Sequence, residues 1–250
     1  MNSFLIALKF LSRLPAPGTP EITAERAARS MILFPLVGAI FGLILVAADW
    51  AFRLLLPALP ANALLLLVWV VLSGGLHLDG FIDCCDGLWV AKSPAERLEI
   101  LRDTHVGAYG VIGTVLLLLV KFAALAGLPQ ATRWPALIVA PVLARWAMVY
   151  ATQRYSYARK GPGLGLWFKE NLRVPHLAAA TVIALALALA GHLWLGPAML
   201  LLTWLATMLI ARWTQSRIGG LTGDAYGMIC EVIEPFILLS MTVIYPLIMR

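Results

Sequence analysis

The chain has 250 residues, of which 61% are hydrophobic and only 13% are charged. Soluble domains average about 45–50% apolar and about 25% charged residues, so this composition, with a mean hydropathy of +0.87, excludes a water-soluble fold. The formal net charge of +6 is explained by basic residues that anchor membrane helices beside anionic lipid. We therefore expect no nucleic-acid partner. The sequence therefore predicts an all-α, polytopic transmembrane helix bundle.

The first residues, 1–14, lack the early basic region and small-residue cleavage site of a signal peptide. They predict an amphipathic helix that lies in the membrane interface. Apolar stretches that can cross a ~30 Å hydrocarbon layer then occur about seven times, with six to eight compatible with the pattern. No polar region is long enough for a second domain, so residues 1–250 are expected to form a single membrane domain. The predicted spans are residues 31–52, 61–76, 107–127, 134–151, 176–195, 197–212 and 235–249.

Basic residues between these spans predict the orientation of the chain. Lys and Arg precede the first span and recur after the second, fourth and sixth spans, whereas the other side keeps only Arg53, Arg133 and Arg250. Cytoplasmic loops carry the excess of Lys and Arg in membrane proteins. We therefore expect the N-terminus and the long loops in the cytoplasm.

Six of the 13 acidic residues fall in two glycine-flanked clusters. In the first, Asp79, Asp83 and Asp86 are spaced i, i+4 and i+7, which places them on one helical face. Like charges this close are stabilised by a cation, and oxygen ligands favour Mg²⁺ with a phosphate or diphosphate. Gly80 and Gly87 bracket the face and would let a diphosphate approach the backbone. The alternative is an ordinary solvated helix end.

The second cluster follows the sixth span. Asp224, Glu231 and Glu234 are spaced i, i+7 and i+10, and we expect them to be further metal ligands on one face of a second helix. Both clusters lie on the predicted cytoplasmic side and are expected to form one site. Alternatively, Glu231 and Glu234 mark a membrane boundary ahead of Pro235. The segment before this cluster supplies the candidate substrate-binding residues Gly220, Thr222 and Gly223.

Two loops carry further candidate substrate contacts. Arg102 and Asp103 precede Gly107 near the start of the third span, where an arginine and free helical N–H groups can bind phosphate. An interfacial arginine before a helix start explains this segment equally well. Gly163 and Gly165 lie in a long basic loop that could cover a nucleotide, although a flexible membrane-proximal loop is nearly as good an account.

Two cations and one histidine are also candidates. Lys121 and Arg145 lie inside predicted spans, where a cation is costly unless it pairs with another group, and we expect both to pair with the carboxylate or phosphate site. His77 is a candidate proton acceptor, although a lone histidine is more often structural.

Six short sequence blocks follow one another along nearly the whole chain. They are Phe10–Pro15, Phe34–Gly38, the run Gly-Gly-Leu-His-Leu-Asp-Gly-x-x-Asp-x-x-Asp-Gly ending at Gly87, Arg102–Gly110, Gly163–Phe168 and Gly219–Glu234. With these blocks the chain resembles the cobalamin synthases, that is, adenosylcobinamide-GDP ribazoletransferases. One departure is His105, where arginine is expected in many relatives, so this position is given no phosphate-binding role.

The resemblance implies a late step of cobalamin biosynthesis in the bacterial inner membrane. An enzyme of this family joins adenosylcobinamide-GDP to α-ribazole or its 5′-phosphate, releases GMP and requires Mg²⁺. We expect the multi-pass chain to carry its active site on the cytoplasmic face. A ribose hydroxyl would attack the cobinamide-side phosphorus, His77 or a carboxylate such as Asp83 would accept the proton, and Arg102 and Lys121 would stabilise the leaving GMP.

Other functions remain open on the residues alone. A CDP-alcohol phosphotransferase or a prenyltransferase also places aspartates on helix faces, but the spacing D-x3-D-x2-D matches neither signature. A cation transporter could line its path with acidic helices, and it predicts carboxylates near the membrane midplane. The sequence leaves homo-oligomerisation and the number of metal ions undecided.

Overall fold

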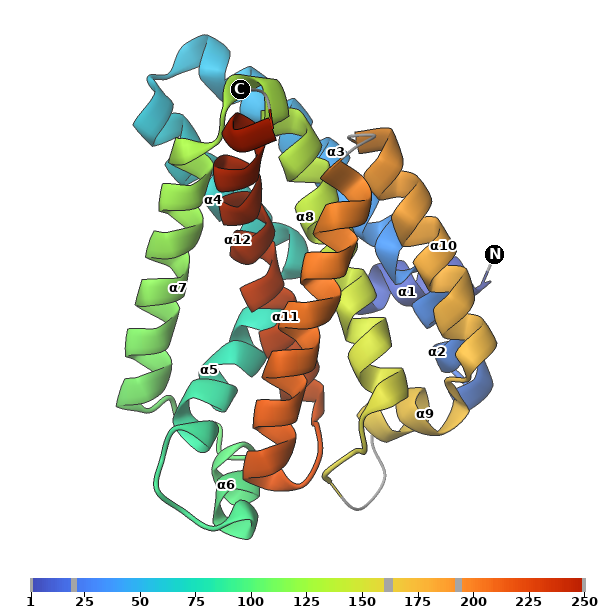
Figure 1. Ribbon diagram of the computed structural model, residues 1–250. Coiled ribbons are helices and arrows are strands. Elements are labelled where there is room, and N and C mark those ends of the chain that lie inside the picture. Colours follow the sequence, from blue (N-terminus) through green and yellow to red (C-terminus); the bar gives the residue numbers. More distant parts are fainter. Residues whose placement is uncertain (1, 19–21, 160–163, 192–194, 249–250) are drawn as a thin grey trace.

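A computed structural model describes residues 2–18, 22–159, 164–191 and 195–248 (Figure 1). Apart from one isolated parallel bridge between Tyr157 and Leu221, the regular structure in these ranges is helical. The helices are α1 (Asn2–Leu11), α2 (Ala24–Ser30), the short 3₁₀ helix η1 (Met31–Leu33), α3 (Phe34–Leu55), α4 (Ala58–Ser73), α5 (Leu76–Leu88), α6 (Pro94–Ile100), α7 (Ala108–Gly127), α8 (Gln130–Arg154), α9 (Leu164–Asn171), α10 (Val174–Gly191), α11 (Leu195–Ile218) and α12 (Gly223–Ile248).

The predicted all-α polytopic bundle is confirmed. Within the described ranges, six helical segments are long and apolar enough to cross a membrane, and α4 with α5 forms a seventh candidate that is bent by 91°. The expected number of about seven spans therefore holds when the bent pair counts as one. The six straight segments are Ala24–Leu55, Ala108–Gly127, Gln130–Arg154, Val174–Gly191, Leu195–Ile218 and Gly223–Leu247.

Several predicted spans differ at their ends from the helices in which they lie; the span expected at 61–76, for example, runs past the end of α4 at Ser73. The span expected at 197–212 belongs to the longer α11, in which the hydroxyls of Thr207 and Thr214 donate to the carbonyls four residues earlier, at 2.7 and 2.9 Å. This back-bonding lets hydroxyl residues continue an apolar helix. The last span is expected to begin at residue 235, after the charges of the second acidic cluster. Helix α12 instead begins at Gly223 and contains these charges. The ends of the spans predicted at 176–195 and 235–249 lie partly outside the described residues.

The bend between α4 and α5 has a local cause. Gly74 and Gly75 have φ values of +64° and +73°, which glycine adopts without the steric cost that a Cβ brings. Gly75 N donates to Val70 O at 3.2 Å and Gly74 N to Val71 O at 2.9 Å, the paired bonds of a Schellman motif. The next carbonyl, of Leu72, accepts from the backbone N of Arg13 at 2.9 Å. The carbonyls of Val70, Val71 and Leu72 at the end of α4 thus have hydrogen-bond donors, and α5 starts in a new direction.

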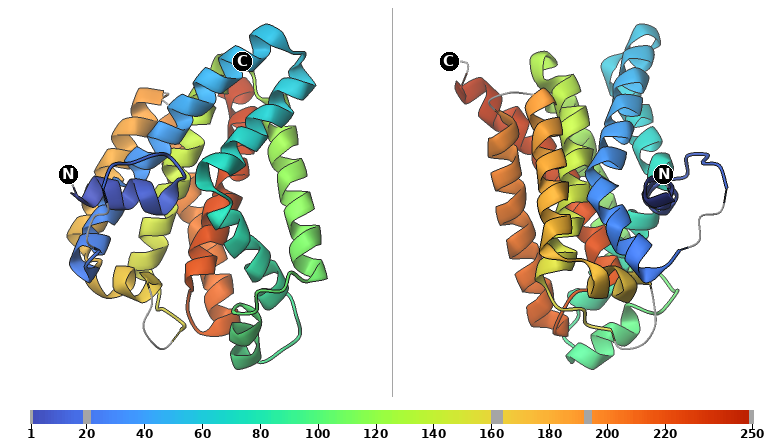
Figure 2. Two further views of the ribbon diagram at one scale, coloured as in Figure 1. Left: turned by 180° about the vertical axis from the view of Figure 1, so that it is seen from behind. Right: turned by 90° about the vertical axis from the view of Figure 1, so that its right-hand side faces the viewer.

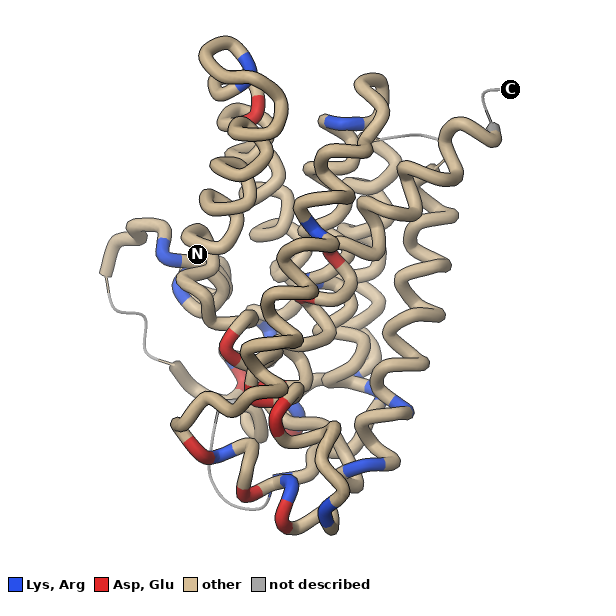
Figure 3. The backbone as a smooth tube through the Cα atoms, turned by 90° about the vertical axis from the view of Figure 1, so that its left-hand side faces the viewer, with Lys and Arg blue, Asp and Glu red and all other residues tan. Residues whose placement is uncertain are grey.

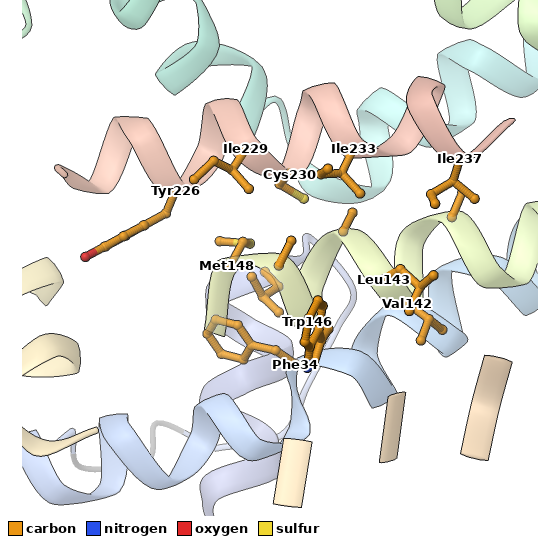
Figure 4. Close-up of a cluster of buried hydrophobic side chains, with 14 of the residues drawn as sticks. Phe34, Val142, Leu143, Trp146, Met148, Tyr226, Ile229, Cys230, Ile233 and Ile237 are labelled. Atoms are coloured by element: carbon orange, nitrogen blue, oxygen red, sulfur yellow. The ribbon is translucent and has the colours of Figure 1, made fainter. Parts of the chain in front are cut away.

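Helix α8 lies at the centre of the bundle, with α3, α10, α11 and α12 packed around it. Figure 4 shows Ile229, Ile233 and Ile237 of α12 lying over the α8 face that carries Leu143 and Met148. On the α3 side, a Cβ at Gly42 would lie 2.5 Å from the Cα of Ile138. Glycine therefore allows α3 and α8 to approach closely, as small residues do in membrane helix pairs.

The two ends of the bundle differ in charge. Figure 3 shows Lys, Arg, Asp and Glu gathered mainly at the end that carries α6. At the other end, the buried guanidinium of Arg133 donates from Nη2 to Asp49 Oδ1 at 2.7 Å and to Asn62 Oδ1 at 2.6 Å.

Helix α1 lies crosswise to the long helices (Figure 2). The predicted helix at 1–14 is thus present as Asn2–Leu11, while its place in the membrane interface stays a prediction.

Candidate active site

The predicted face of three aspartates lies on one helix, α5, but its members have different surroundings. Asp79 is exposed, Asp83 is half-buried and Asp86 is buried. Asp86 accepts the backbone N–H of Gly107 through Oδ2 and that of Gly110 through Oδ1, both at 2.8 Å. Its carboxylate therefore satisfies the free N–H groups that begin α7. The N–H of Gly107 is donated to Asp86, so this geometry does not support its predicted contact with phosphate.

Helices α5 and α12 cross where glycine removes the side chains. A Cβ at Gly80 would lie 2.9 Å from both the Cα and the carbonyl oxygen of Asp224, and a Cβ at Gly227 would lie 3.1 Å from the carbonyl oxygen of His77. Real Cβ atoms essentially never lie as close to backbone atoms as 2.9 Å, and the 3.1 Å distance at Gly227 is tighter than most Cβ contacts. Gly80 is thus required for the close contact of the two acidic helices, a role that differs from the predicted contact with a diphosphate.

This crossing brings one carboxylate from each cluster, Asp79 and Asp224, to a single cavity of about 190 Å³. The cavity is lined by residues of α1, η1, α3, α5, α8, α9 and α12. Its residues are Phe10, Met31, Phe34, Leu76, His77, Asp79, Gly80, Met148, Thr152, Gly165, Phe168, Gly223, Asp224, Tyr226 and Gly227.

One wall of the cavity is aromatic. Phe10 and Phe168 have ring centroids 5.0 Å apart, and Phe34 lies 6.0 Å from Phe10 and 6.1 Å from Phe168. The three rings come from α1, α3 and α9 and meet at tilted and stacked angles, the range that aromatic pairs prefer. They provide an apolar part of the lining of the same cavity that also receives polar residues from α5 and α12.

The polar wall contains a buried histidine. The side chain of His77 is 2% exposed, and neither ring nitrogen has a hydrogen-bond partner among the described residues. An unpaired polar group in the interior is costly, so such a group points to a ligand or a chemical role. Asp224 lines the same cavity, and its Oδ2 accepts from Arg159 Nη2 at 2.7 Å and from Thr222 Oγ1 at 3.2 Å. Thr222 Oγ1 in turn accepts the backbone N–H of Ala225 at 3.2 Å.

A short backbone bridge holds Arg159 in place. Ala158 N donates to Leu221 O, and Leu221 N donates to Ser156 O, each at 2.8 Å. A Cβ at Gly220 would lie 2.7 Å from Ser156 O, so the glycine is needed for the close approach of the two segments. Arg159 also donates to the carbonyl of Leu101 at 2.7 Å. The guanidinium thus joins three segments at the edge of the cavity.

The rest of the second cluster does not line the cavity with Asp79 and Asp224, and its predicted role in binding a metal stays a prediction. Ten residues of helix rise ~15 Å, so Glu234 lies deep in the bundle relative to Asp224. There Glu231 accepts from Lys121 Nζ at 3.3 Å, and Glu234 pairs with both Lys121 and Arg145. All four side chains are nearly inaccessible. The predicted pairing of Lys121 and Arg145 with carboxylates is confirmed, but with Glu231 and Glu234 as partners these groups form an internal ion-pair network.

Other predicted residues lie outside the cavity wall. Arg102 and Asp103 are exposed in the loop between α6 and α7. The Asp103 carboxylate contacts His105 Nδ1 at 2.6 Å, and this hydrogen bond raises the pKa of His105 and lowers that of Asp103. Gly87 packs against α6, where its Cβ would lie 2.8 Å from Leu101 Cγ.

The loop glycines divide between described and undescribed parts of the chain. Gly163 lies outside the described residues. Gly165 and Gly223 both line the cavity, and a Cβ at Gly165 would lie 2.5 Å from the hydroxyl of Tyr157. Within the described ranges, no group of three or more His, Cys, Asp or Glu side chains is placed to hold a metal ion.

Sequence reasoning did not select four residues that the structure places at the site. Phe10, Phe34 and Phe168 each stand in a block that suggested the resemblance, but a lone phenylalanine in an apolar chain gives no functional signal. Arg159 lies in the long basic loop that also contains Gly163 and Gly165, where no residue spacing singles it out. Its contact with Asp224 joins positions that are far apart in sequence, and no spacing rule predicts such a contact.

Fold and site together define a polytopic membrane protein with a buried histidine, carboxylates and an aromatic wall around one cavity. The family model described as cobalamin-5-phosphate synthase matches residues 3–242. The chain belongs to this family.

Relatives named adenosylcobinamide-GDP ribazoletransferase align over nearly the full length. The protein from Roseiflexus sp. is 40% identical over 96% of this chain and 89% of its own length. The one from Desulfitobacterium hafniense is 38% identical over 98% and 99%, and the one from Pseudomonas savastanoi is 39% identical over 98% and 100%. No solved structure matches the chain significantly.

Proposed function

We propose that this membrane transferase joins adenosylcobinamide-GDP to α-ribazole or its 5′-phosphate and releases GMP, a late step of cobalamin biosynthesis. The family and the names of its relatives support the reaction. The observation that carries the assignment to a site is the cavity that His77, Asp79 and Asp224 line together with three phenylalanine rings. This combination suits an acceptor with an apolar base and a reactive hydroxyl.

The aromatic wall would bind the acceptor. The base of α-ribazole is a flat, largely apolar bicycle, and the rings of Phe10, Phe34 and Phe168 provide a surface on which such a base can pack. With the base against this wall, its ribose would point toward α5 and α12. The cavity of about 190 Å³ is sized for the base and part of the sugar, which leaves the corrin and the guanosine outside it.

His77 is the proposed proton acceptor. A ribose hydroxyl attacks the cobinamide-side phosphorus, a new O–P bond forms, and the bond to the bridging oxygen breaks so that GMP leaves with that oxygen. The hydroxyl proton passes to a ring nitrogen of His77. Both nitrogens lack a partner among the described residues, so one is available to accept a proton from a bound hydroxyl.

Asp79 and Asp224, which both line the cavity, would hold Mg²⁺ together with the phosphates of the substrate. Magnesium is commonly bound through one or two carboxylates together with substrate phosphates, so two carboxylates at one cavity suit this ion without a complete protein cage. When bound, it would neutralise the charge that develops on the diphosphate. Arg159 positions the Asp224 carboxylate through its 2.7 Å contact and brings a cation to the same edge of the cavity.

We place the cavity on the cytoplasmic side of the bacterial inner membrane. The end of the bundle that carries the cavity also carries most of the charged residues (Figure 3), and the excess of Lys and Arg on this side supports a cytoplasmic location. GMP would then leave directly into the cytoplasm.

The test is GMP release from purified protein in detergent with adenosylcobinamide-GDP and α-ribazole. We expect release only when both the acceptor and Mg²⁺ are present. Asp79→Asn keeps the size of the side chain but removes its charge, and should slow release about 100-fold because one metal ligand is lost. The matched control is Glu99→Gln, an exposed carboxylate on α6 at the same end of the bundle, which should leave the rate unchanged.

Two results would contradict the proposal. Release of CMP from a CDP-alcohol, with no GMP from adenosylcobinamide-GDP, would indicate another transferase. An unchanged rate in Asp79→Asn would remove the cavity from the reaction.

A further inference from the structure

A second and larger cleft lies on the other side of α5. Its volume is about 610 Å³, and it separates α7 from α11, with α5 and α12 between them (Figure 1). Ile112, Leu116 and Val120 of α7 form one side and are largely exposed. Phe81 and Cys85 of α5 form part of the floor. Because α7 and α11 are both candidate membrane spans, this apolar cleft faces the hydrocarbon of the bilayer.

The cleft extends over about one leaflet. Along α12 its lining runs from Met228 to Leu239, a rise of ~16 Å along the helix axis. Half of a ~30 Å hydrocarbon core is ~15 Å. A groove that deep and that apolar matches one lipid acyl chain that enters from the nearer membrane surface.

Aromatic residues and a cation mark the shallow end of the cleft. Trp89 and Trp213 lie with ring centroids 5.6 Å apart, and the exposed Tyr109 lies at the start of α7. Trp and Tyr concentrate at the level of the lipid headgroups. The guanidinium of Arg217 lies over the ring of Trp213, 5.6 Å from its centroid. A positive charge at headgroup level beside an acyl-sized groove is complementary to an anionic phospholipid.

We propose that this cleft binds an anionic phospholipid from the leaflet on the α6 side. One acyl chain lies between α7 and α11, and the phosphate contacts Arg217, whose planar guanidinium binds phosphate oxygens in pairs. The lipid would contact Phe81 and Cys85, on the same helix that carries Asp79. The site is separate from the cavity of His77 and Asp224, with which it shares no residue.

Native mass spectrometry of the detergent-purified full chain tests this proposal. Delipidated protein is titrated with phosphatidylglycerol or with phosphatidylcholine of the same acyl chains. We expect one tightly retained phosphatidylglycerol, bound about fivefold more tightly than phosphatidylcholine because of one interfacial cation. Arg217→Gln should abolish this preference. Val120→Trp, which fills the cleft, should prevent retention of either lipid.

The matched controls lie outside the cleft. Arg173→Gln removes an exposed cation at the same end of the bundle, and Val182→Trp enlarges an exposed side chain of α10. Both should retain lipid as the wild type does. Equal binding of the two lipids by the wild type would overturn the proposal without any variant. A dimer that Val120→Trp dissociates would instead identify the cleft as an interface between two copies, and would overturn it as well.

Discussion

Lys121 shows how this bundle accommodates a cation in its interior. Its ammonium lies 3.3 Å from Glu231 Oε2, also pairs with Glu234, and lies 4.5 Å from the centre of the Trp69 ring. Arg145 completes the network through Glu234 and through the ring of Phe41, 4.6 Å away. Two cations and two carboxylates balance one another. Such buried groups are stable only as a unit, because each alone would be an uncompensated charge.

Lys121→Met should therefore destabilise the protein by about 3–5 kcal/mol, because Glu231 would lose the cation with which it pairs and Glu234 would keep only its ion pair with Arg145. The double variant Lys121→Met/Glu231→Met removes one charge of each sign and should recover part of that loss. Thermal unfolding in detergent measures both. An unchanged Tm in Lys121→Met, together with lost GMP release, would contradict the structural role and restore the direct contact with GMP expected from sequence.

At the scale of elements, the crossing of α5 and α12 determines the geometry of the cavity. A methyl group at Gly80 meets backbone atoms of Asp224 at 2.9 Å, and backbone cannot rotate away as a side chain can. The two helices would have to separate, and Asp79 would move relative to Asp224. Such a displacement, of roughly 1 Å, is enough to disturb a phosphoryl-transfer site.

Gly80→Ala should therefore lower GMP release about 100-fold in a protein that still folds. Gly127→Ala is the control: it also adds a methyl group to a helical glycine, but its Cβ would meet only Thr242 Cγ2 at an ordinary 3.5 Å. It should keep the wild-type rate. Wild-type turnover in Gly80→Ala would show that the close crossing is not needed for the reaction.

Helical spacing predicted which acidic residues share a helix better than it predicted how deep in the bundle they lie. Carboxylates at i, i+4 and i+7 correctly placed Asp79, Asp83 and Asp86 on one helix, because the helical period is a local property of the sequence. The same reasoning placed Glu231 and Glu234 beside a metal. It could not predict their pairing with Lys121 and Arg145, because these cations come from α7 and α8, far away in sequence.

The sequence around Asp86 also did not predict its role at the start of α7. A carboxylate beside glycines is typical of phosphate chemistry, but it serves equally well to satisfy the start of another helix. Only the positions of Gly107 and Gly110 in space distinguish the two roles. The aromatic wall was not predictable from spacing at all, because its three rings come from three separate segments.

At the scale of the whole molecule, the orientation in the membrane remains a prediction from charge. Helix α6 and the connection from α7 to α8 lie at opposite ends of the bundle (Figure 1). In a background in which the buried Cys84, Cys85 and Cys230 are replaced by alanine, single cysteines can report each end. Ala95→Cys on α6 and Ala131→Cys at the start of α8 are both exposed positions.

An impermeant thiol reagent should label Ala95→Cys only from the cytoplasmic side and Ala131→Cys only from outside, because the basic residues favour a cytoplasmic α6 end. Right-side-out and inverted membrane vesicles provide the two accesses, and the cysteine-free chain gives the background. The reverse labelling pattern would place the cavity outside the cytoplasm.

The position of α1 links the predicted contact of the protein with the membrane interface to the shape of its cavity. The segment that begins with α1 brings Phe10 to the wall of the cavity and Arg13 to the carbonyl that ends α4. If α1 lies in the membrane interface as its sequence predicts, lateral pressure in the headgroup layer acts on the same residues that shape the acceptor cavity. Mechanical changes in the bilayer would then reach the chemistry directly, without a separate sensor domain.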